Sequence, residues 1–531
     1  MELVFRRIRE LSKNITVYGL GDVAVSIVNF FLLSVYVTYF SATDYGAIGI
    51  LGGMEVVAKI VFRFGLDGSF MRFFYDAGDE RGRQKLASTI FFFLLILDGA
   101  VVAVLLLAAP ALSQALLDSP VYTTALRLML INTFVIGFTF FPFHVLRMEN
   151  RTKTFSLMTL ARSVLTIVVR LLLVTKADMG VTGLYLADLL VTLVVFGALI
   201  RYFAPLIRPL FSADVLRESL AFGLPRVPHA AAQQVTAVGD KFILPIFTTM
   251  ENIGIYNMAV SFGLTQKLFL SAFESAWAPF YYATIREPEA PRVFRTVTTY
   301  AVAVLALLTA GLAAVGRDAA AAMLHGRLIA PDDPRWQDVT TVITWTSIGV
   351  FLQGFYLLTS IGLNITKRTQ YYPVATIAAA ATNVTLNFLW IPRYGIVGAA
   401  WANGAAYAVQ AALGYSLSQR FYPITYEWGR LARACGAAII AAITGRSIPH
   451  VALNVDPRST MAHLPDVFTR GLAVILMFGG LLALTRFFRP EELRRLRALR
   501  GRGASARTKV AATDSTEMAG EIVATDISTP E

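Results

Sequence analysis

The sequence is poor in cysteine and in charged side chains. Cys435 is the only cysteine among 531 residues, which excludes an intrachain disulfide and a thiolate metal cluster. The five histidines show no HExxH or comparable ligand spacing, so metal catalysis has no support. Charged residues make up 15% of the chain, against roughly a quarter in soluble proteins. The segments between the apolar runs are too short for a soluble catalytic domain, so we predict no enzyme and no catalytic residue.

Long apolar runs dominate the chain instead. Hydrophobic residues make up 56% of the sequence, and they gather in runs rather than at amphipathic spacing. About 20 mostly apolar residues span a bilayer, and roughly fourteen segments satisfy this rule. The fold class predicted is therefore an all-α polytopic membrane protein with about 14 transmembrane helices. The predicted spans are 15–39, 45–65, 86–109, 124–146, 155–174, 181–203, 218–247, 253–274, 295–315, 337–363, 371–390, 396–418, 431–449 and 467–487.

The net charge of +12 is distributed as in a membrane protein, not as in a nucleic-acid-binding protein. Basic residues precede the first span and follow every second span up to the tenth, whereas loops 40–44, 110–123 and 248–252 contain none. This positive-inside pattern predicts that both termini are cytoplasmic. The first apolar run is too long for a signal peptide, and no small-residue cleavage site follows it, so we expect an uncleaved span.

Parts of the sequence occur twice. Residues 44–83 align without a gap on 252–291, which pairs Gly46 with Gly254 and Lys59 with Lys267 at an offset of 208. Residues 179–188 also resemble 394–403. Two similar halves, each of several spans, are typical of a transporter. Because each half has an even number of spans, we expect two six-helix bundles related by a pseudo-two-fold axis along the membrane normal, plus two extra C-terminal helices.

This repeat divides the chain into six predicted parts. The last two follow from composition: a short basic amphipathic stretch suited to anionic headgroups, and a tail poor in aromatic residues. The parts are 1–14, a basic cytoplasmic N-terminus; 15–210, the N-terminal bundle; 211–420, the C-terminal bundle; 421–488, the appended helix pair; 489–503, the basic amphipathic segment; and 504–531, a disordered cytoplasmic tail.

Ionisable residues recur on single faces of the second and eighth spans. Glu55, Lys59 and Arg63 lie four residues apart, so they share a face of one helix. Lys267 and Glu274 share a face with Ser271 in the eighth span. An ionised side chain at the centre of a span costs roughly 2.5–3.5 kcal/mol, so such residues need a partner or a hydrated cavity.

The seventh and first spans carry similar polar stripes. In the seventh, Arg226, His229, Gln233 and Asp240 lie on one face, and prolines near its start interrupt the backbone hydrogen bonds. In the first, Asp22 is the deep charge. We expect the four faces to line one central cavity between the bundles.

Several of these polar residues also have a purely structural interpretation. Asp98 and Asp188 are typical of helix–helix hydrogen bonds, and either is a potential partner for Arg162 or Arg170. Asn383 and Asn387 are more typical of packing than of a binding site. For Asp240 and Lys241, near the outer end of their span, snorkelling and a gate ion pair are both open.

Three stretches resemble a known family. They are FGLPRVPHAAAQQVTAVGDKFILPIFTTMENIGIYNMAVSFG at 222–263, the segment 364–428 that begins NITKRTQYYPVATIAAAATN, and GLDGSFMRFFYDA at 65–77. They are similar to the oligosaccharide flippases (polysaccharide biosynthesis, Wzx-like) of the multidrug/oligosaccharidyl-lipid/polysaccharide flippase superfamily. The resemblance covers most of residues 10–430 and specifies the family better than the substrate.

The resemblance implies a cationic central cavity and flipping of polyprenyl-pyrophosphate-linked glycans by alternating access. Related lipid II flippases bind pyrophosphate through basic residues on the first, second and eighth helices. Lys59, Arg63 and Lys267 match the second and eighth by position. The first helix departs from that pattern, because its deep charge is Asp22.

These observations give the predicted function and site. We expect translocation of a lipid-linked oligosaccharide across a bacterial plasma membrane, with a cation-coupled multidrug exporter or, less favoured, a membrane glycan polymerase or glycosyltransferase as the alternative. The predicted substrate-binding residues are Lys59, Arg63, Lys267, Arg226, His229 and Gln233. The predicted coupling or gate residues are Asp22, Glu55, Glu274, Asp240 and Lys241.

The predicted environment follows from the same function. No cofactor or metal is expected, and coupling to a proton gradient, a sodium gradient or the membrane potential stays open. The expected partners are the lipid-linked substrate, the bilayer, a polysaccharide polymerase and glycosyltransferases, but no nucleic acid. The protein is expected to be a monomer.

Overall fold

The computed structural model describes residues 32–149, 151–451, 456 and 458–490. The predictions for the N-terminal segment 1–14, for Asp22 and most of the first span, for the amphipathic stretch beyond residue 490 and for the tail lie outside this range. Within it, all regular secondary structure is helical. Nine helices of the described part are long and apolar enough to cross a membrane. The all-α membrane fold predicted from the sequence is confirmed.

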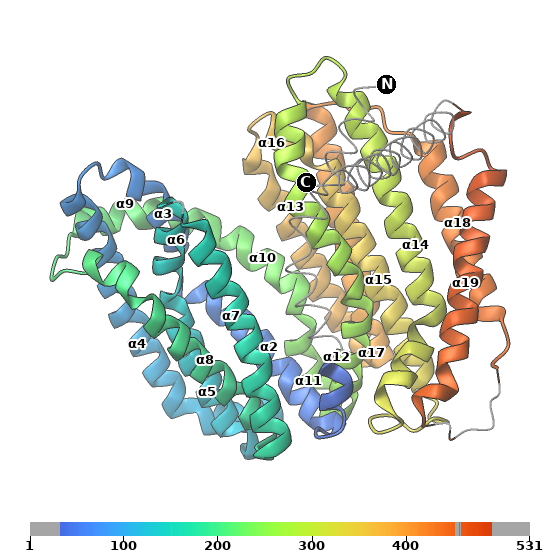
Figure 1. The fold of residues 1–531 in the computed structure, drawn as a ribbon, viewed down its shortest axis with the longest axis horizontal. Coiled ribbons are helices and arrows are strands. Elements are labelled where there is room, and N and C mark those ends of the chain that lie inside the picture. The colour runs from blue at the N-terminus through green and yellow to red at the C-terminus, as the bar shows by residue number, and fades with distance from the viewer. Residues whose placement is uncertain (1–31, 150, 452–455, 457, 491–531) are drawn as a thin grey trace, which may run out of the picture.

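The helices form two lobes that meet at one end and diverge at the other (Figure 1). The N-terminal lobe holds α2 (Ala42–Val61), α3 (Leu66–Asp76), α4 (Glu80–Leu117), α5 (Thr123–Phe138), α6 (Phe140–Met148), α7 (Thr152–Leu171) and α8 (Gly180–Phe203). Helices α3, α4, α5, α6 and α8, together with α9 (Ala213–Gly223), pack around an aromatic cluster in which Phe70, Phe140 and Phe141 are buried. Edge-on contacts of Phe70 with Phe74 and Phe141 fill this core, in the geometry that aromatic pairs favour.

The C-terminal lobe and the appended helices form the other half of Figure 1. The C-terminal lobe holds α10 (Val227–Val238), α11 (Asp240–Phe247), α12 (Met250–Gly263), α13 (Lys267–Thr284), α14 (Ala290–Leu324), α15 (Trp336–Thr359), α16 (Ile361–Ile365) and α17 (Tyr372–Phe421). Within α17, Gly395 is non-helical at φ 55°, so two helices meet there, between the predicted spans 371–390 and 396–418. The appended helices α18 (Trp428–Ser447) and α19 (Thr460–Leu484) pack against α14.

The seventh predicted span is broken and joins the lobes. Its first part, α9 (Ala213–Gly223), packs on α3 and α4, whereas α10 packs on α17. The break at Leu224–Arg226 coincides with Pro225, which cannot donate a backbone hydrogen bond. Here Gly223 meets Gly65, which has φ 70° and precedes α3. Two breaks in two helices therefore lie in contact.

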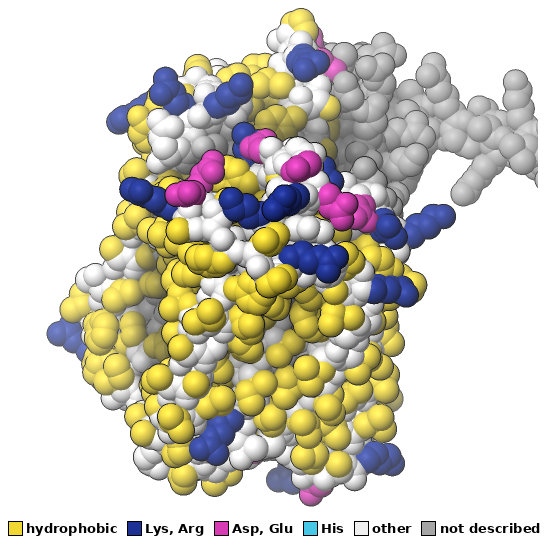
Figure 2. All heavy atoms as spheres, turned by 90° about the vertical axis from the view of Figure 1, so that its left-hand side faces the viewer, with side chains coloured by type: hydrophobic (Ala, Val, Ile, Leu, Met, Phe, Trp, Pro, Cys, Tyr) yellow, Lys and Arg dark blue, Asp and Glu magenta, His cyan; other side chains and the backbone are white. Residues whose placement is uncertain are grey.

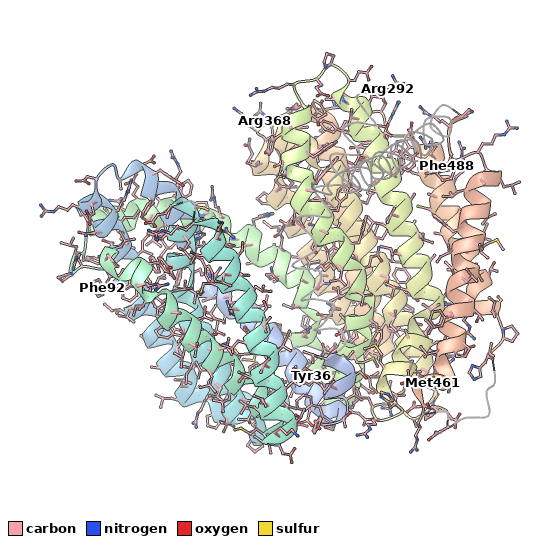
Figure 3. The ribbon with its side chains drawn as sticks, viewed as in Figure 1. Tyr36, Phe92, Arg292, Arg368, Met461 and Phe488 are labelled. Carbon is pink, nitrogen blue, oxygen red and sulfur yellow. The ribbon has the colours of Figure 1, made fainter. Side chains whose placement is uncertain are left out.

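The outer face of the N-terminal lobe is apolar over a broad band (Figure 2). Large hydrophobic side chains are exposed there, including Ile96, Val104 and Leu107 on α4 and Val194 on α8. A belt of Lys, Arg, Asp and Glu crosses the upper end in that view. Arg292 and Arg368 lie at the upper end of the other lobe and Met461 at its lower end (Figure 3). An exposed apolar band with charged residues at its ends is the surface that a bilayer covers.

Candidate functional site

A cavity of about 630 Å³ lies between α2–α3 of the N-terminal lobe and α10. Val56, Lys59, Ile60 and Arg63 reach it from α2 and the segment after it, because residues three and four apart share a helix face. The break at Gly65 then turns the chain, so that Asp67, Gly68 and Met71 of α3 form a second wall. Two predicted site residues on one helix face thus line one cavity.

The opposite wall comes from the break in the seventh span. Arg226, Val227, Ala230 and Gln234 form it, and His144 of α6 also lines the cavity. The Arg226 guanidinium lies 4.3 Å from the Phe222 ring centroid and forms no ion pair with a described residue. A cation over an aromatic face keeps its charge, which therefore stays available to a ligand.

The cavity carries an excess of positive charge. Lys59, Arg63 and Arg226 line it, against Asp67 as the one carboxylate among its lining residues. Arg63 lies 3.7 Å from Asp67, and both side chains remain about one-third exposed. Lys59 is held by Glu55 at 2.6 Å, one helical turn away. The series Glu55, Lys59, Arg63 therefore continues to Asp67, and the carboxylates at its two ends keep the two basic side chains between them in place.

The other predicted binding residues lie outside the lining of this cavity. His229 directs Nδ1 to the Thr376 hydroxyl of α17 at 2.9 Å, so it contacts the interior of the C-terminal lobe. Gln233 is exposed, and its neighbour Gln234 lines the cavity instead. Lys267 and Glu274 form no ion pair with each other. Because the seventh span bends at Pro225, its polar stripe does not form one continuous wall.

Sequence reasoning missed two ionisable lining residues. His144 is in the cavity although no metal-ligand spacing singles it out, and Asp67 lies beyond the predicted end of the second span. Asp67 was detectable as the i+4 partner of Arg63. His144 carried no such signal, because α6 reaches the cavity only through packing between α3 and α8.

Asp240 lies in a second polar cluster, inside the C-terminal lobe. Its side chain is buried and accepts hydrogen bonds from the Tyr256 hydroxyl and, at 3.0 Å, from the Asn403 amide. Asn403 in turn accepts from Asn383 at 2.7 Å, and Asn383 accepts from Asn387 at 2.9 Å. The Asp240 carboxylate bonds the backbone N–H of Lys241, not its ammonium group. Neither of the two interpretations left open from the sequence applies to Asp240. Its carboxylate forms no ion pair with the Lys241 ammonium group, and its side chain is not exposed.

The N-terminal lobe contains a third polar region. Arg170 of α7 donates two hydrogen bonds to Asp188 of α8, at 2.7 and 2.6 Å, the bidentate geometry that guanidinium and carboxylate favour. This pair borders a hollow of about 370 Å³ that Glu55, Asn132 and Arg162 also line. Arg170 therefore has the structural partner considered from the sequence. One carboxylate oxygen of Asp98 has no hydrogen-bond partner among the described residues.

Two lobes around a basic cavity, with polar clusters buried inside each lobe, define a two-lobed helical membrane fold. The likeness to solved structures agrees with this class. Over 87% of this chain and 98% of the other, the fold matches the lipid II flippase MurJ in an inward closed conformation, with TM-score 0.64 and 13% identity. It also matches an inward-facing multidrug resistance MATE family transporter of the MOP superfamily over 78% of this chain and 98% of that one, with TM-score 0.61 and 16% identity.

The family follows from the sequence itself. Residues 39–326, more than half of the chain, match the model of a family described as polysaccharide biosynthesis protein. The chain belongs to this family, as the resemblance predicted. No curated protein matches it significantly. The family and the fold neighbours support a multi-pass membrane protein of polysaccharide biosynthesis with the fold that MurJ and MATE proteins share.

Proposed function

We propose that the protein flips a polyprenyl-pyrophosphate-linked oligosaccharide from the cytoplasmic to the outer leaflet of the bacterial plasma membrane, for surface polysaccharide biosynthesis. The observation that carries this proposal is the basic cavity between the lobes. A diphosphate is anionic. Lys59 and Arg63 place two cations on one wall of the cavity, and Arg226 places a third on the opposite wall. Charge-assisted hydrogen bonds to phosphate oxygens are strong where water is partly excluded.

The topology gives the cavity a direction. The arginine-rich helix ends lie on the side where the lobes diverge, and the positive-inside rule assigns such an end to the cytoplasm. The lobes are in contact at the opposite end, through α2 and α12. This conformation is then open to the inside. The headgroup enters between the lobes, while the lipid tail stays in the bilayer.

The cavity charge distinguishes this substrate from a cationic drug. A cation would gain from an acidic cavity, whereas the lining residues here carry three basic groups and one carboxylate. Repulsion between like charges therefore disfavours a cationic substrate, which is the weakness of the multidrug-exporter alternative.

The test is a flipping assay in vesicles that contain a short polyprenyl diphosphate disaccharide. We expect Lys59→Gln, Arg63→Gln and Arg226→Gln each to lower the flipping rate at least tenfold, because each removes one phosphate contact. Arg81→Gln, an exposed change at the same end of the molecule, is the matched control. If the three cavity variants flip the substrate as fast as the control, or if the wild type moves only a cationic drug, the proposal is wrong.

A further inference from the structure

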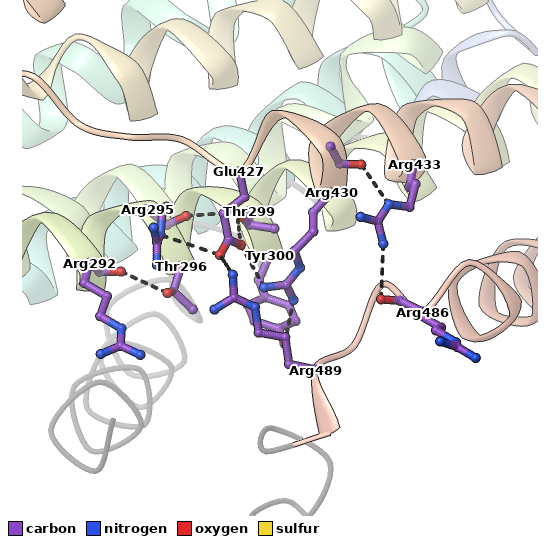
Figure 4. Close-up of polar contacts among 11 residues, drawn as sticks. Arg292, Arg295, Thr296, Thr299, Tyr300, Glu427, Arg430, Arg433, Arg486 and Arg489 are labelled. Carbon is purple, nitrogen blue, oxygen red and sulfur yellow. Dashed lines mark hydrogen bonds and ion pairs between the residues drawn. The ribbon is translucent and has the colours of Figure 1, made fainter.

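Six arginines gather at the upper end of the appended helix pair (Figure 4). Three helix ends contribute two each, always three residues apart. The pairs are Arg292 and Arg295 at the start of α14, Arg430 and Arg433 at the start of α18, and Arg486 and Arg489 just after α19. We refer to these six residues as the arginine cluster. None of them lines the basic cavity between the lobes.

One buried carboxylate organises the arginine cluster. The Glu427 side chain is only 7% exposed, and it pairs with Arg430 at 2.7 Å, with Arg489 at 2.6 Å and with Arg295 at 3.5 Å. It also accepts a hydrogen bond from the Thr299 hydroxyl at 3.1 Å. A single residue therefore ties α14, the start of α18 and the segment after α19 together. Arginines that only set the membrane topology would not need to converge on one buried carboxylate.

Arg433 is fixed in the cluster without being neutralised. Its Nε donates to the Gly429 carbonyl at 2.9 Å, and its Nη1 donates to the Thr485 carbonyl at 2.8 Å. Carbonyl oxygens orient a guanidinium but leave its positive charge uncompensated. Arg433 and Arg486 are both exposed, and neither forms an ion pair with a carboxylate in the described part of the chain. Arg433 also donates to the Arg486 backbone carbonyl at 3.2 Å, so two exposed cationic residues are neighbours at one helix junction (Figure 4).

The depth of the cluster matches that of lipid headgroups. All three helices begin or end here, and Trp428, adjacent to Glu427, is 51% exposed. Exposed tryptophans are enriched at the membrane–water interface. Leu484, at the end of α19, is 80% exposed and marks the edge of the apolar surface. An arginine beside these residues therefore faces the phosphate layer of one leaflet.

We propose that the arginine cluster is a binding site for an anionic phospholipid, whose phosphate lies against Arg433 and Arg486 at the junction of α18 and the end of α19. Basic pockets between transmembrane helices on the cytoplasmic side are suited to phospholipid phosphates. The site is independent of the transported molecule, and its occupant bridges the start of α18 and the segment after α19.

The full-length protein in nanodiscs of phosphatidylethanolamine, with or without phosphatidylglycerol, tests this site. We expect phosphatidylglycerol to raise the apparent melting temperature of the wild type and to remain bound in its native mass spectrum. Arg433→Gln/Arg486→Gln should lose that rise and retain at least one fewer phosphatidylglycerol. Arg433→Lys/Arg486→Lys should restore part of both effects, because the charge returns. Arg72→Gln/Arg201→Gln, exposed changes on the other lobe, should behave like the wild type.

Three outcomes would overturn the proposal. One is equal phosphatidylglycerol retention in the Arg433/Arg486 and Arg72/Arg201 double variants. Another is a wild type that does not distinguish phosphatidylglycerol from phosphatidylethanolamine. The third is full reproduction of the thermal shift by inorganic phosphate in detergent, which would assign the site to a free anion. Should the double glutamine variant fail to fold, Arg486→Gln alone carries the test, because its exposed side chain forms no ion pair with a described residue.

Discussion

Gly46 of α2 and Gly254 of α12 pack directly against each other where the two lobes meet. A Cβ atom on Gly254 would lie 3.1 Å from the backbone nitrogen of Gly46 and would collide with the carbonyl oxygen of Ala42. A Cβ atom on Gly46 would in turn collide with the carbonyl oxygen of Met250. Small residues allow such close helix crossings in membranes. These are the same two glycines that the sequence repeat aligns with each other.

Enlarging either glycine should separate the lobes at their closed end. We expect Gly46→Ala and Gly254→Ala each to cost about 1–3 kcal/mol, because backbone atoms cannot move aside as a flexible side chain can. The apparent melting temperature in detergent measures the effect. Gly52→Ala is the matched control on α2, since a Cβ atom there meets nothing within 4 Å. A control as destabilising as Gly46→Ala would contradict the close-packing argument.

The pair Arg170–Asp188 predicts a larger loss of stability. Asp188→Asn removes the charge that balances Arg170, whose side chain is only about one-third exposed. Leaving one member of a buried pair uncompensated costs roughly 3 kcal/mol, and the double change Arg170→Met/Asp188→Leu should recover most of it. The exposed pair Arg151–Glu149 is the control. Glu149→Gln should cost less than about 1 kcal/mol by the same thermal measurement.

The membrane fold and part of the cavity were predictable from the sequence, for physical reasons. Apolar runs must cross the bilayer as helices, because backbone groups have no other partners there. Lys59 and Arg63 were predictable because four-residue spacing places side chains on one helix face. Asp67 continues the four-residue spacing of this series in the sequence, although the break at Gly65 places it on α3.

What the sequence did not reveal depends on where helices break. Arg226 and Asp240 share a face of an ideal helix, yet the break at Leu224–Arg226 places Arg226 in the cavity, and Asp240 contacts Tyr256 inside the C-terminal lobe. Pro225 marks a break, but not the direction of the chain after it. That direction is set by packing of α9 on α3 and of α10 on α17. The number of spans, the two-fold axis and the division at residue 210 stay predictions.

The contact between Gly65 and Gly223 predicts a hinge between the lobes. A Cβ atom on Gly223 would lie 2.8 Å from the Gly65 carbonyl oxygen, and Gly65 has a φ of 70° that favours glycine. We expect Gly223→Ala to slow flipping more than tenfold while protein levels stay normal, because the two breaks can no longer slide past each other. Gly137→Ala, where a Cβ atom has free space, is the control. Equal rates for both variants would exclude a hinge at this contact.

The Asp240 cluster predicts where an ion gradient would act, because Asp240 is the one predicted coupling carboxylate among the described residues that is buried among amide and hydroxyl groups. Asp240→Asn keeps the shape of the side chain and removes its charge. We therefore expect the variant to fold, to bind the lipid-linked substrate as the wild type does, and to flip it at a rate independent of proton or sodium gradients. Glu274→Gln, an exposed change on α13, should keep the gradient response of the wild type.

The measurement is the flipping rate in vesicles with each gradient imposed in turn. A gradient response that survives in Asp240→Asn and disappears in Glu274→Gln would move coupling to α13. A wild type indifferent to both gradients would leave the membrane potential, acting on the bound diphosphate, as the driving force.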